Sequence, residues 1–469
     1  MNFRIARKLL IKIVNTKPIA PFKPKLRNLA RKFNLPSSSL YYPEVSSDVG
    51  DFQRILLLEN FTYQEFEPKN IITKEVITPD LERKIRSVAK KGATVISFAH
   101  DNFTENLGGI QTVMNLENKV ISGTSGNYWS LNPVESVNSF TFSPLLDLLH
   151  NGEKVGQIES RNIGQFFKIL EDIAGKQNKS MLIVLHSLLG HDPEKVADAL
   201  KGLEIGEIYF YLHDFYSICP SVKLLRNDLE FCHGPKMTST ACKVCIYGNA
   251  RPVHVRRIDS ILNLPGIKLL APSESTHDIW SASSELGMKA DLMPHLRLTP
   301  TASGREKINS KPKIAFIGHP VKGKGWESFV ILSKLLNETH EFWVFSQHDP
   351  RISGITFRLL TNGSGKIHHT RDLLIESEID YAFIFPNWPE TYSLVTAEAI
   401  SAAVFVLTNS NSGNVAALVR EFNSGAVFED LESVVEFLKS NPKVNFDLQI
   451  YDTEFAGIVE KFARTNNYG

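Results

Sequence analysis

The chain has 469 residues, of which 42% are hydrophobic and 10% are aromatic. A chain of this length and composition buries two or three cores, which excludes a small disulfide-stapled module and a disordered tail. The charges nearly cancel, with 52 Lys and Arg residues against 51 Asp and Glu residues, so the net charge does not indicate a nucleic-acid partner.

The basic residues gather at the N-terminus. Residues 1–43 contain ten basic residues and no acidic one, which leaves 42 basic against 51 acidic residues in the rest of the chain. We assign residues 1–50 to a basic arm, whose segment 3–14 predicts either a cationic helix on an anionic membrane surface or a solvated arm. Arg7, Lys8 and Lys12 interrupt the N-terminal apolar run and no small-residue cleavage site follows it, so the sequence does not predict a secretory signal. No stretch approaches the roughly 18–20 apolar residues that a spanning helix requires. We expect a cytoplasmic protein, either free or held peripherally at the inner membrane face.

From about residue 94, short apolar runs alternate with helical patterns, as is typical of doubly wound parallel sheets. A polar, turn-forming segment at 299–304 divides this alternation into two blocks. The expected strands of the two blocks are 94–99, 181–185, 207–212 and 268–271, then 313–318, 341–346, 381–385, 404–408 and 426–428. The sequence therefore predicts an α/β chain with two Rossmann-like domains, 51–300 and 305–445, facing across a cleft. Residues 446–469 should carry a helix, near 453–464, that packs back across the junction.

In open α/β sheets ligands bind beyond the carboxyl ends of the strands. After strand 381–385 a turn carries Glu390 and opens a helix near Ser393, in which Glu398 lies among apolar residues. The N-terminus of a helix attracts a diphosphate, and a carboxylate in apolar company needs a donor such as a sugar hydroxyl. The alternative is a pair of surface acids on an amphipathic helix.

A second junction carries positive charge. Strand 313–318 is followed by His319, Lys322, Lys324 and Gly325, a glycine-rich turn with two ammonium groups at the mouth of a helix. Such a turn suits phosphate, although turns of this kind are common.

These residues resemble the retaining GT-B glycosyltransferases of family 4, whose Glu-x7-Glu signature is matched by Pro386, Glu390, Glu398 and Ala399. The resemblance implies that Glu390 contacts the transferred sugar and that Glu398 contacts the nucleotide ribose. It further implies a donor-phosphate site formed by the remaining matched positions: Lys324, Gly325 and the backbone of Tyr392, Ser393 and Leu394.

The match departs from the family in two places. His319 stands where the family has an arginine, which weakens the phosphate site unless Lys322 compensates. The segment Thr391, Tyr392 and Ser393 replaces the usual Gly-Phe-Gly.

The first block carries two further matches. Gly108 and Gly109 follow strand 94–99, where a glycine pair in the family approaches the donor phosphate or the acceptor; a bare pair equally marks a plain turn. His213 and Asp214 end strand 207–212 and resemble the family's His-Asp near the reacting sugar, where the imidazole would bind the sugar or steer the acceptor. The alternative for His213 is an ordinary structural residue, and His186 is a weaker candidate of the same kind.

All four cysteines lie in one loop, 219–245. Cys219, Cys232, Cys242 and Cys245 have the spacing Cys-x12-Cys-x9-Cys-x2-Cys. The spacing predicts a closed structural zinc site that braces the acceptor side, with unligated thiols or an iron–sulfur cluster as alternatives. No Asp-x-Asp motif is present, so we expect no catalytic divalent metal.

The combined prediction is a retaining glycosyltransferase of the hexosyltransferase type, with 51–300 as acceptor domain and 305–445 as donor domain. It would move a sugar from a nucleotide sugar to a saccharide or lipid-linked saccharide in glycan or polysaccharide biosynthesis, and no nucleic acid is expected as a partner. His213, Asp214 and Glu390 are the catalytic candidates, with most of the catalysis assigned to electrostatics and positioning. The alternatives are a nucleotide-sugar epimerase of the same shape and a catalytically silent saccharide-binding or assembly protein.

Overall fold

The computed structural model describes residues 64–65, 77–90, 92–134, 139–174, 181–203, 207–302, 311–361, 369–440 and 450–466. The chain divides into two units, Met1–Leu57 and Leu58–Gly469, and all described residues lie in the second. The basic arm and its predicted membrane contact lie outside the described residues. Within the ranges given above, no helix is both long and apolar enough to cross a membrane.

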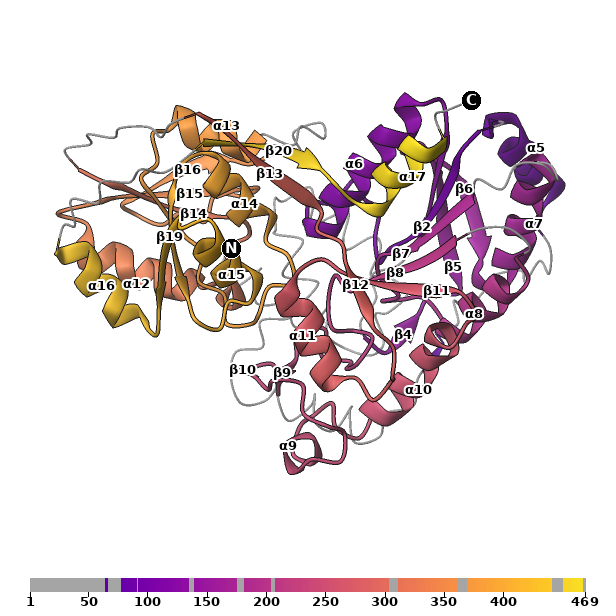
Figure 1. Ribbon diagram of the computed structural model, residues 1–469, viewed down its shortest axis with the longest axis horizontal. Coiled ribbons are helices and arrows are strands. Elements are labelled where there is room, and N and C mark those ends of the chain that lie inside the picture. Colours follow the sequence, from indigo (N-terminus) through magenta and orange to yellow (C-terminus); the bar gives the residue numbers. More distant parts are fainter. Residues whose placement is uncertain are drawn as a thin grey trace, which may run out of the picture. The chain divides into compact units, whose positions relative to one another are not determined.

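The first half of the described chain forms an eight-stranded sheet with the order β12-β11-β8-β7-β2-β3-β5-β6 (Figure 1). The strands from β12 to β3 are parallel, whereas β5 and β6 run antiparallel at one edge. The bounds are β2 (Thr94–Phe98), β3 (Asn127–Pro133), β5 (Leu145–His150), β6 (Glu153–Glu159), β7 (Met181–Leu185), β8 (Glu207–Tyr211), β11 (Ile267–Ala271) and β12 (Ala290–Leu292).

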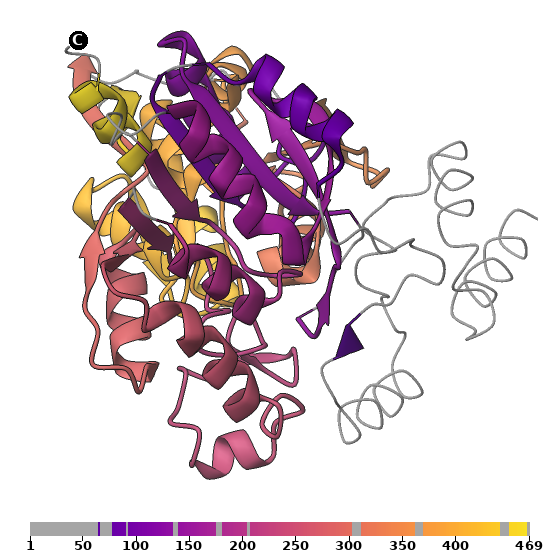
Figure 2. The ribbon, with the colours of Figure 1, turned by 90° about the vertical axis from the view of Figure 1, so that its right-hand side faces the viewer.

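Helices cover both faces of this sheet (Figure 1 and Figure 2). One face packs against α6 (Gly109–Gly123) and α17 (Ile458–Asn466), and its core includes Met114 and Val459. The other face packs against α5 (Pro79–Val88), α7 (Ile163–Ala174), α8 (Pro193–Lys201) and α10 (Arg251–Leu262). The central strands β2 and β7 are buried along their whole length, and β7 is a continuous apolar run rather than an alternating one.

The second half forms a six-stranded parallel sheet with the order β16-β15-β14-β17-β18-β19. Helices α13, α14 and α15 cover one face, and α12 and α16 cover the other. The bounds are β14 (Lys313–Ile317), α12 (Trp326–Leu336), β15 (Glu341–Ser346), β16 (Ile355–Leu359), α13 (His369–Glu376), β17 (Tyr381–Phe383), α14 (Leu394–Ser401), β18 (Phe405–Asn409), α15 (Asn414–Glu421), β19 (Gly425–Phe428) and α16 (Leu431–Lys439).

Two linker strands join these halves. Strand β13 (Leu296–Ala302) pairs antiparallel with β20 (Ile450–Phe455). Helix α11 (Glu274–Ser283) follows β11. The remaining elements are short: β1 (Gln64–Glu65), β4 (Thr141–Phe142), η2 (Ser160–Asn162), β9 (Leu225–Arg226), β10 (Glu230–Phe231), α9 (Thr240–Lys243) and η3 (Lys322–Lys324).

The predicted fold class is confirmed, because two doubly wound α/β layers are present. Within the two large sheets, strands β3, β5, β6, β12 and β16 were not predicted, and neither were the linker strands β13 and β20. Strands β5 and β6 form a hairpin around Asn151 and Gly152, both with positive φ, and this Asn-Gly pair was an available hairpin signal.

The final helix was placed too early. Residues 453–455 belong to strand β20, and the helix begins at Ile458. Pairing with β13, which lies some 150 residues away in the sequence, overrides the local helical pattern.

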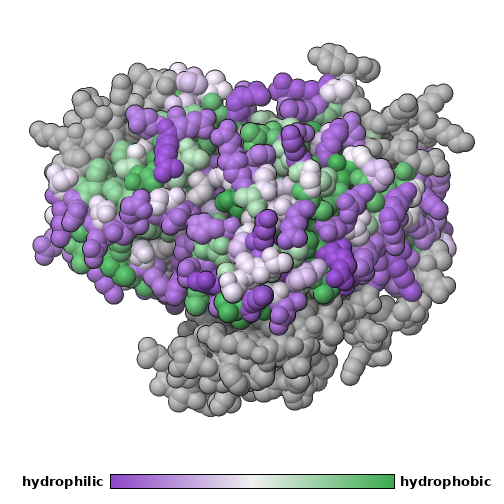
Figure 3. All heavy atoms as spheres, turned by 60° about the horizontal axis from the view of Figure 1, so that its bottom comes forward, coloured by the Kyte–Doolittle hydropathy of each residue, from purple (hydrophilic) through white to green (hydrophobic). Residues whose placement is uncertain are grey.

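The surface mixes hydrophilic and hydrophobic residues. On the face in Figure 3 the coloured residues show purple side chains interspersed with small green patches, as is ordinary for a folded protein.

Candidate active site

The two loops chosen from the sequence meet at the carboxyl ends of β14 and β17. The Lys324 Nζ lies 3.1 Å from the Glu390 Oε1, and the Glu390 side chain is 17% exposed. Both residues line a small pocket together with Phe316, Ile317, Phe383, Ile384, Pro386, Ser393 and Val395. The structure thus brings an acid and an ammonium group together where ligands bind in this kind of sheet.

Backbone contacts fix the position of Glu390. Its N–H donates to the Ser412 carbonyl, and its carbonyl accepts from the Asn414 N–H. Gly413, between them, has a φ of 64°, and a Cβ there would lie 2.8 Å from the Glu390 carbonyl oxygen. Only glycine allows the two loops to approach this closely.

The turn that carries Lys324 is packed against the Glu390 loop. Gly325 has a φ of 85°, and a Cβ on it would lie 2.3 Å from the Phe385 carbonyl oxygen. A Cβ on Gly323 would meet the Trp388 ring at 1.9 Å. These glycines let Lys324 reach Glu390.

Helix α14 begins where the sequence predicted. The Ser393 side chain caps it by accepting from the Thr396 N–H, and the Ser393 N–H donates to the Asn414 side chain at 2.9 Å. The Ser393 N–H, one of those expected at the phosphate, therefore already has a partner. Leu394 is the first residue of the helix.

Glu398 lies inside this helix. Burial raises the pKa of its carboxyl to about 8, and hydrogen bonds with Thr370 on α13 oppose that shift. Glu398 is therefore mostly protonated at neutral pH, and a hydroxyl-rich ligand would favour its ionised form.

His319 and Lys322, the other two candidates in this turn, differ in charge and exposure. Burial, His348 and Lys324 lower the pKa of His319, so its ring is neutral at pH 7. The Lys322 side chain is 71% exposed, and its Nζ lies 3.9 Å from Glu327.

Lys223, which the sequence did not single out, contributes positive charge instead. Its Nζ lies 3.8 Å from the centroid of the Trp388 ring. Burial, and to a smaller extent the charge of Lys324, lower the pKa of Lys223 to about 8, while the charge of Glu390 acts to raise it. An isolated lysine on an irregular loop gives no sequence signal, and only the fold places it near Lys324.

The glycine pair lies at the start of α6. Gly108 is extended, with a φ of −177°, and a Cβ on it would meet only the end of the Gln111 side chain. A Cβ on Gly109 would meet nothing within 4 Å. The protein's own packing leaves space in front of Gly109, which a ligand could fill.

His213 and Asp214 follow β8. The His213 Nε2 lies 2.8 Å from the His186 Nδ1, and burial together with His295 and His186 lowers the His213 pKa well below its usual value. Asp214 accepts from the Tyr216 N–H at 2.8 Å, and burial raises its pKa to about 6. At neutral pH the histidine is neutral and the aspartate is charged.

The His213 end of β8 contacts the Glu390 loop directly. The Thr391 Oγ1 donates to the His213 carbonyl at 2.5 Å, and the Thr391 carbonyl accepts from Ser273 and Thr276 at 2.7 and 2.9 Å. The Tyr392 hydroxyl bonds to the backbone of Leu296. Thr391 and Tyr392 thus hold the Glu390 loop against the first half of the chain.

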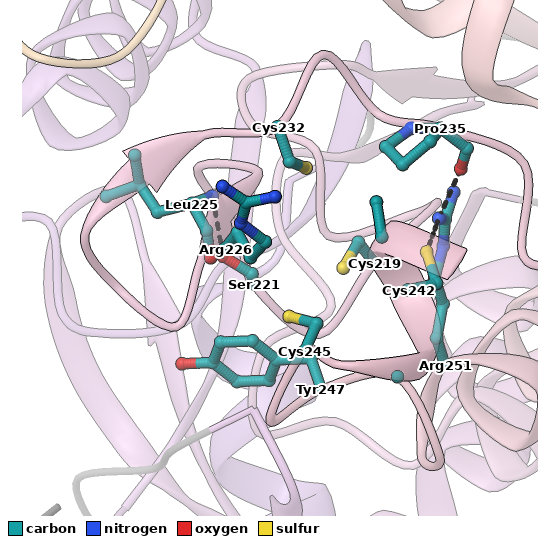
Figure 4. A pocket seen from close by; sticks show the side chains of 12 residues that line it. Cys219, Ser221, Leu225, Arg226, Cys232, Pro235, Cys242, Cys245, Tyr247 and Arg251 are labelled. Atoms are coloured by element: carbon teal, nitrogen blue, oxygen red, sulfur yellow. Dashed lines mark hydrogen bonds between the residues drawn. The ribbon is translucent and has the colours of Figure 1, made fainter. Parts of the chain in front are cut away.

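The cysteine loop departs from the prediction. All four cysteines line one cavity (Figure 4), but among the residues described here no group of three or more His, Cys, Asp or Glu side chains is arranged to hold a metal ion. Arg251 enters the cluster and donates to the Cys242 Sγ at 3.0 Å. Burial raises the pKa of Cys219 to about 12, which favours the thiol over the metal-binding thiolate. The structure therefore does not support the predicted zinc site.

The sequence matches no protein-family model and no curated protein. Among solved structures, sucrose-phosphate synthase from Thermosynechococcus elongatus is similar, with a TM-score of 0.50 and 10% identity over 80% of this chain and 94% of that chain. HepE from Anabaena in complex with UDP-glucose is also similar, with a TM-score of 0.46 and 10% identity over 80% of this chain and 94% of that chain. WaaG, a glycosyltransferase involved in lipopolysaccharide biosynthesis, has a TM-score of 0.42 and 13% identity over 79% of this chain and 94% of that chain. These neighbours are GT-B glycosyltransferases, and at such identities the likeness shows the GT-B fold.

Proposed function

We propose that the protein is a retaining glycosyltransferase of the hexosyltransferase type, which moves a sugar from a nucleotide-sugar donor to a saccharide or lipid-linked saccharide. One observation carries the proposal: Glu390 and Lys324 meet in a pocket at the carboxyl ends of two parallel strands, and the Glu390 loop contacts the His213 end of β8. The GT-B fold supports it as the setting of the site. An epimerase or a silent binding protein is not favoured.

The donor diphosphate is bound by positive charge. Lys324 and Lys223 supply two ammonium groups near the start of α14, whose N-terminal end adds favourable partial charge. Without a donor, Lys324 is paired with Glu390, and the diphosphate takes over the lysine when it binds. Glu390 is then free to accept hydrogen bonds from the transferred sugar, and Glu398 from the ribose.

In the reaction, the bond between the anomeric carbon and the diphosphate breaks as the acceptor oxygen bonds to that carbon. The acceptor proton leaves to a diphosphate oxygen, and the lysines stabilise the charge on the leaving group. His213 and Asp214 orient the two saccharides, which keeps the reacting atoms in place.

A thermal-shift panel of nucleotide sugars tests the donor site, because a ligand that binds the folded state raises its melting temperature. We expect one donor to stabilise the wild type, and Lys324→Ala and Glu398→Ala to lose that shift. Lys334→Ala, on an exposed position of α12, is the matched control and should keep it. If no nucleotide sugar shifts the wild type, the proposal is wrong.

Product analysis tests the stereochemistry. With the donor so identified, a panel of saccharide acceptors should give a product whose anomeric configuration, measured by NMR, equals that of the donor. An inverted product would contradict the retaining mechanism.

A further inference from the structure

A chain of buried polar side chains runs behind His213. The Glu117 Oε2 on α6 lies 3.0 Å from the His186 Nε2, and the His186 Nδ1 lies 2.8 Å from the His213 Nε2. The Tyr128 hydroxyl donates to the same Glu117 oxygen at 2.8 Å. The side chains of Glu117 and His186 are both 0% exposed.

This chain is costly to bury. A carboxylate without solvent loses several kcal/mol of hydration unless its partners compensate for that loss. The Glu117 Oε1 is buried and has no partner among the described residues. An apolar residue would pack the space between α6 and the sheet at lower cost, so the polar chain needs a reason beyond packing.

The hydrogen-bond geometry accommodates one consistent order of protons along this chain. A carboxylate at Glu117 accepts from a protonated His186 Nε2, and a singly protonated His186 ring offers a lone pair at Nδ1. In this arrangement the His213 Nε2 donates to His186, and the His213 Nδ1 carries no proton. The ring of His213 is held in orientation by stacking on His295, with centroids 4.8 Å apart and an interplanar angle of 16°.

We propose that Glu117 and His186 are positioning residues: they hold His213 in the Nε2-protonated tautomer, so that its Nδ1 accepts a hydrogen bond from a saccharide hydroxyl. The identity of the ligand rests on the proposed function, whereas the tautomer does not. The His213 Nδ1 thereby accepts a hydrogen bond from a hydroxyl group and has no proton to donate to the saccharide. Neither Glu117 nor His186 touches the substrate.

Nitrogen-15 NMR of the protein labelled at histidine tests the tautomer directly, with the His213 signals assigned by their loss in His213→Gln. We expect a pyridine-type resonance for Nδ1 of His213 in the free wild type. A protonated Nδ1 there would overturn the inference, whether or not any variant folds.

Variants then test the role of Glu117. Glu117→Gln should shift His213 towards a tautomer mixture or the Nδ1-protonated form, because an amide can also donate to His186. Tyr128→Phe removes the tyrosine's hydrogen bond to Glu117 but leaves the carboxyl group and His186 in place, so it should keep the wild-type tautomer. An unchanged His213 spectrum in Glu117→Gln would contradict the relay. If Glu117→Gln does not fold, His186→Phe removes the partner of the His213 Nε2. This variant should likewise no longer favour the Nε2-protonated tautomer of His213.

Kinetics complete the test. Glu117→Gln should lower kcat about tenfold, the effect of one lost neutral hydrogen bond, with a smaller change in the donor KM. An unchanged kcat would mean that the Nδ1 does not accept from the reacting saccharides. Failure of the proposed function appears differently, as the absence of any thermal shift with nucleotide sugars, and it leaves the tautomer measurement valid.

Discussion

Glu398 couples stability to pH. Burial raises its pKa from 4.5 to about 8, so between these values the folded state keeps a proton that the unfolded state has lost. The free energy of unfolding must therefore fall as pH rises through this window, by at most about 1.4 kcal/mol per pH unit from this group.

We predict that Glu398→Gln flattens this dependence, because the amide does not titrate. Urea denaturation at pH 5.5 and 7.5 should show a smaller loss of stability in the variant than in the wild type. An equal loss in both proteins would mean that Glu398 is ionised throughout the range.

Lys223 and Lys322, two lysines near the Lys324 turn, differ in their surroundings. Lys223 lies over the Trp388 ring and near Lys324, whereas Lys322 is 71% exposed beside Glu327. We predict that Lys223→Ala weakens donor binding by about tenfold or more, since a charge-assisted hydrogen bond contributes roughly 1.5–3 kcal/mol. Lys322→Ala is the control and should change the dissociation constant less than twofold. Titration calorimetry decides, and equal effects of the two variants would argue against a role for Lys223.

At the scale of elements, the turn between β14 and α12 depends on a left-handed glycine. Both Gly325 and Gly354 have positive φ, at 85° and 82°, but only Gly325 has a close neighbour, the Phe385 carbonyl. Gly354→Ala should therefore cost about 1–2 kcal/mol, the backbone strain alone.

Gly325→Ala adds a clash to that strain, so we predict a loss of stability at least twice as large and loss of the donor-induced thermal shift. Chemical denaturation and thermal shift of both variants check this. Equal stability losses would show that the turn relaxes away from Phe385.

At the scale of the whole molecule, the C-terminal helix belongs to the first sheet. Val459 is fully buried in the core that includes α6 and β8, and the Ile458 N–H donates to the Tyr211 hydroxyl at 3.3 Å. The chain thus crosses between the domains twice, through β13 and β20.

We predict that Val459→Asp destabilises the first domain by about 3 kcal/mol or more, because it buries an unpaired charge. Lys461→Asp, on the exposed face of the same helix, should stay within about 0.5 kcal/mol of wild type. Hydrogen exchange should increase in α6 and β8 for Val459→Asp; an increase confined to the second sheet would contradict this packing.

Much of the fold followed from local patterns. Buried parallel strands such as β2, β7 and β14 are short and mostly apolar, and Ser393 is a recognisable helix cap, so both were predictable. Strand β20 was not, because a long-range partner decides its conformation.

The sequence alone determined the α/β class, the two blocks and the turns that carry Glu390 and Lys324, because strand ends and glycine turns are local properties. Only the tertiary structure decided that these two residues pair, that Lys223 joins them and that Glu117 lies behind His213. Those contacts join residues between 66 and about 170 positions apart, and no local pattern encodes such proximity. The same reason explains the cysteine cluster: spacing suggested four ligands, but the cavity also admits Arg251.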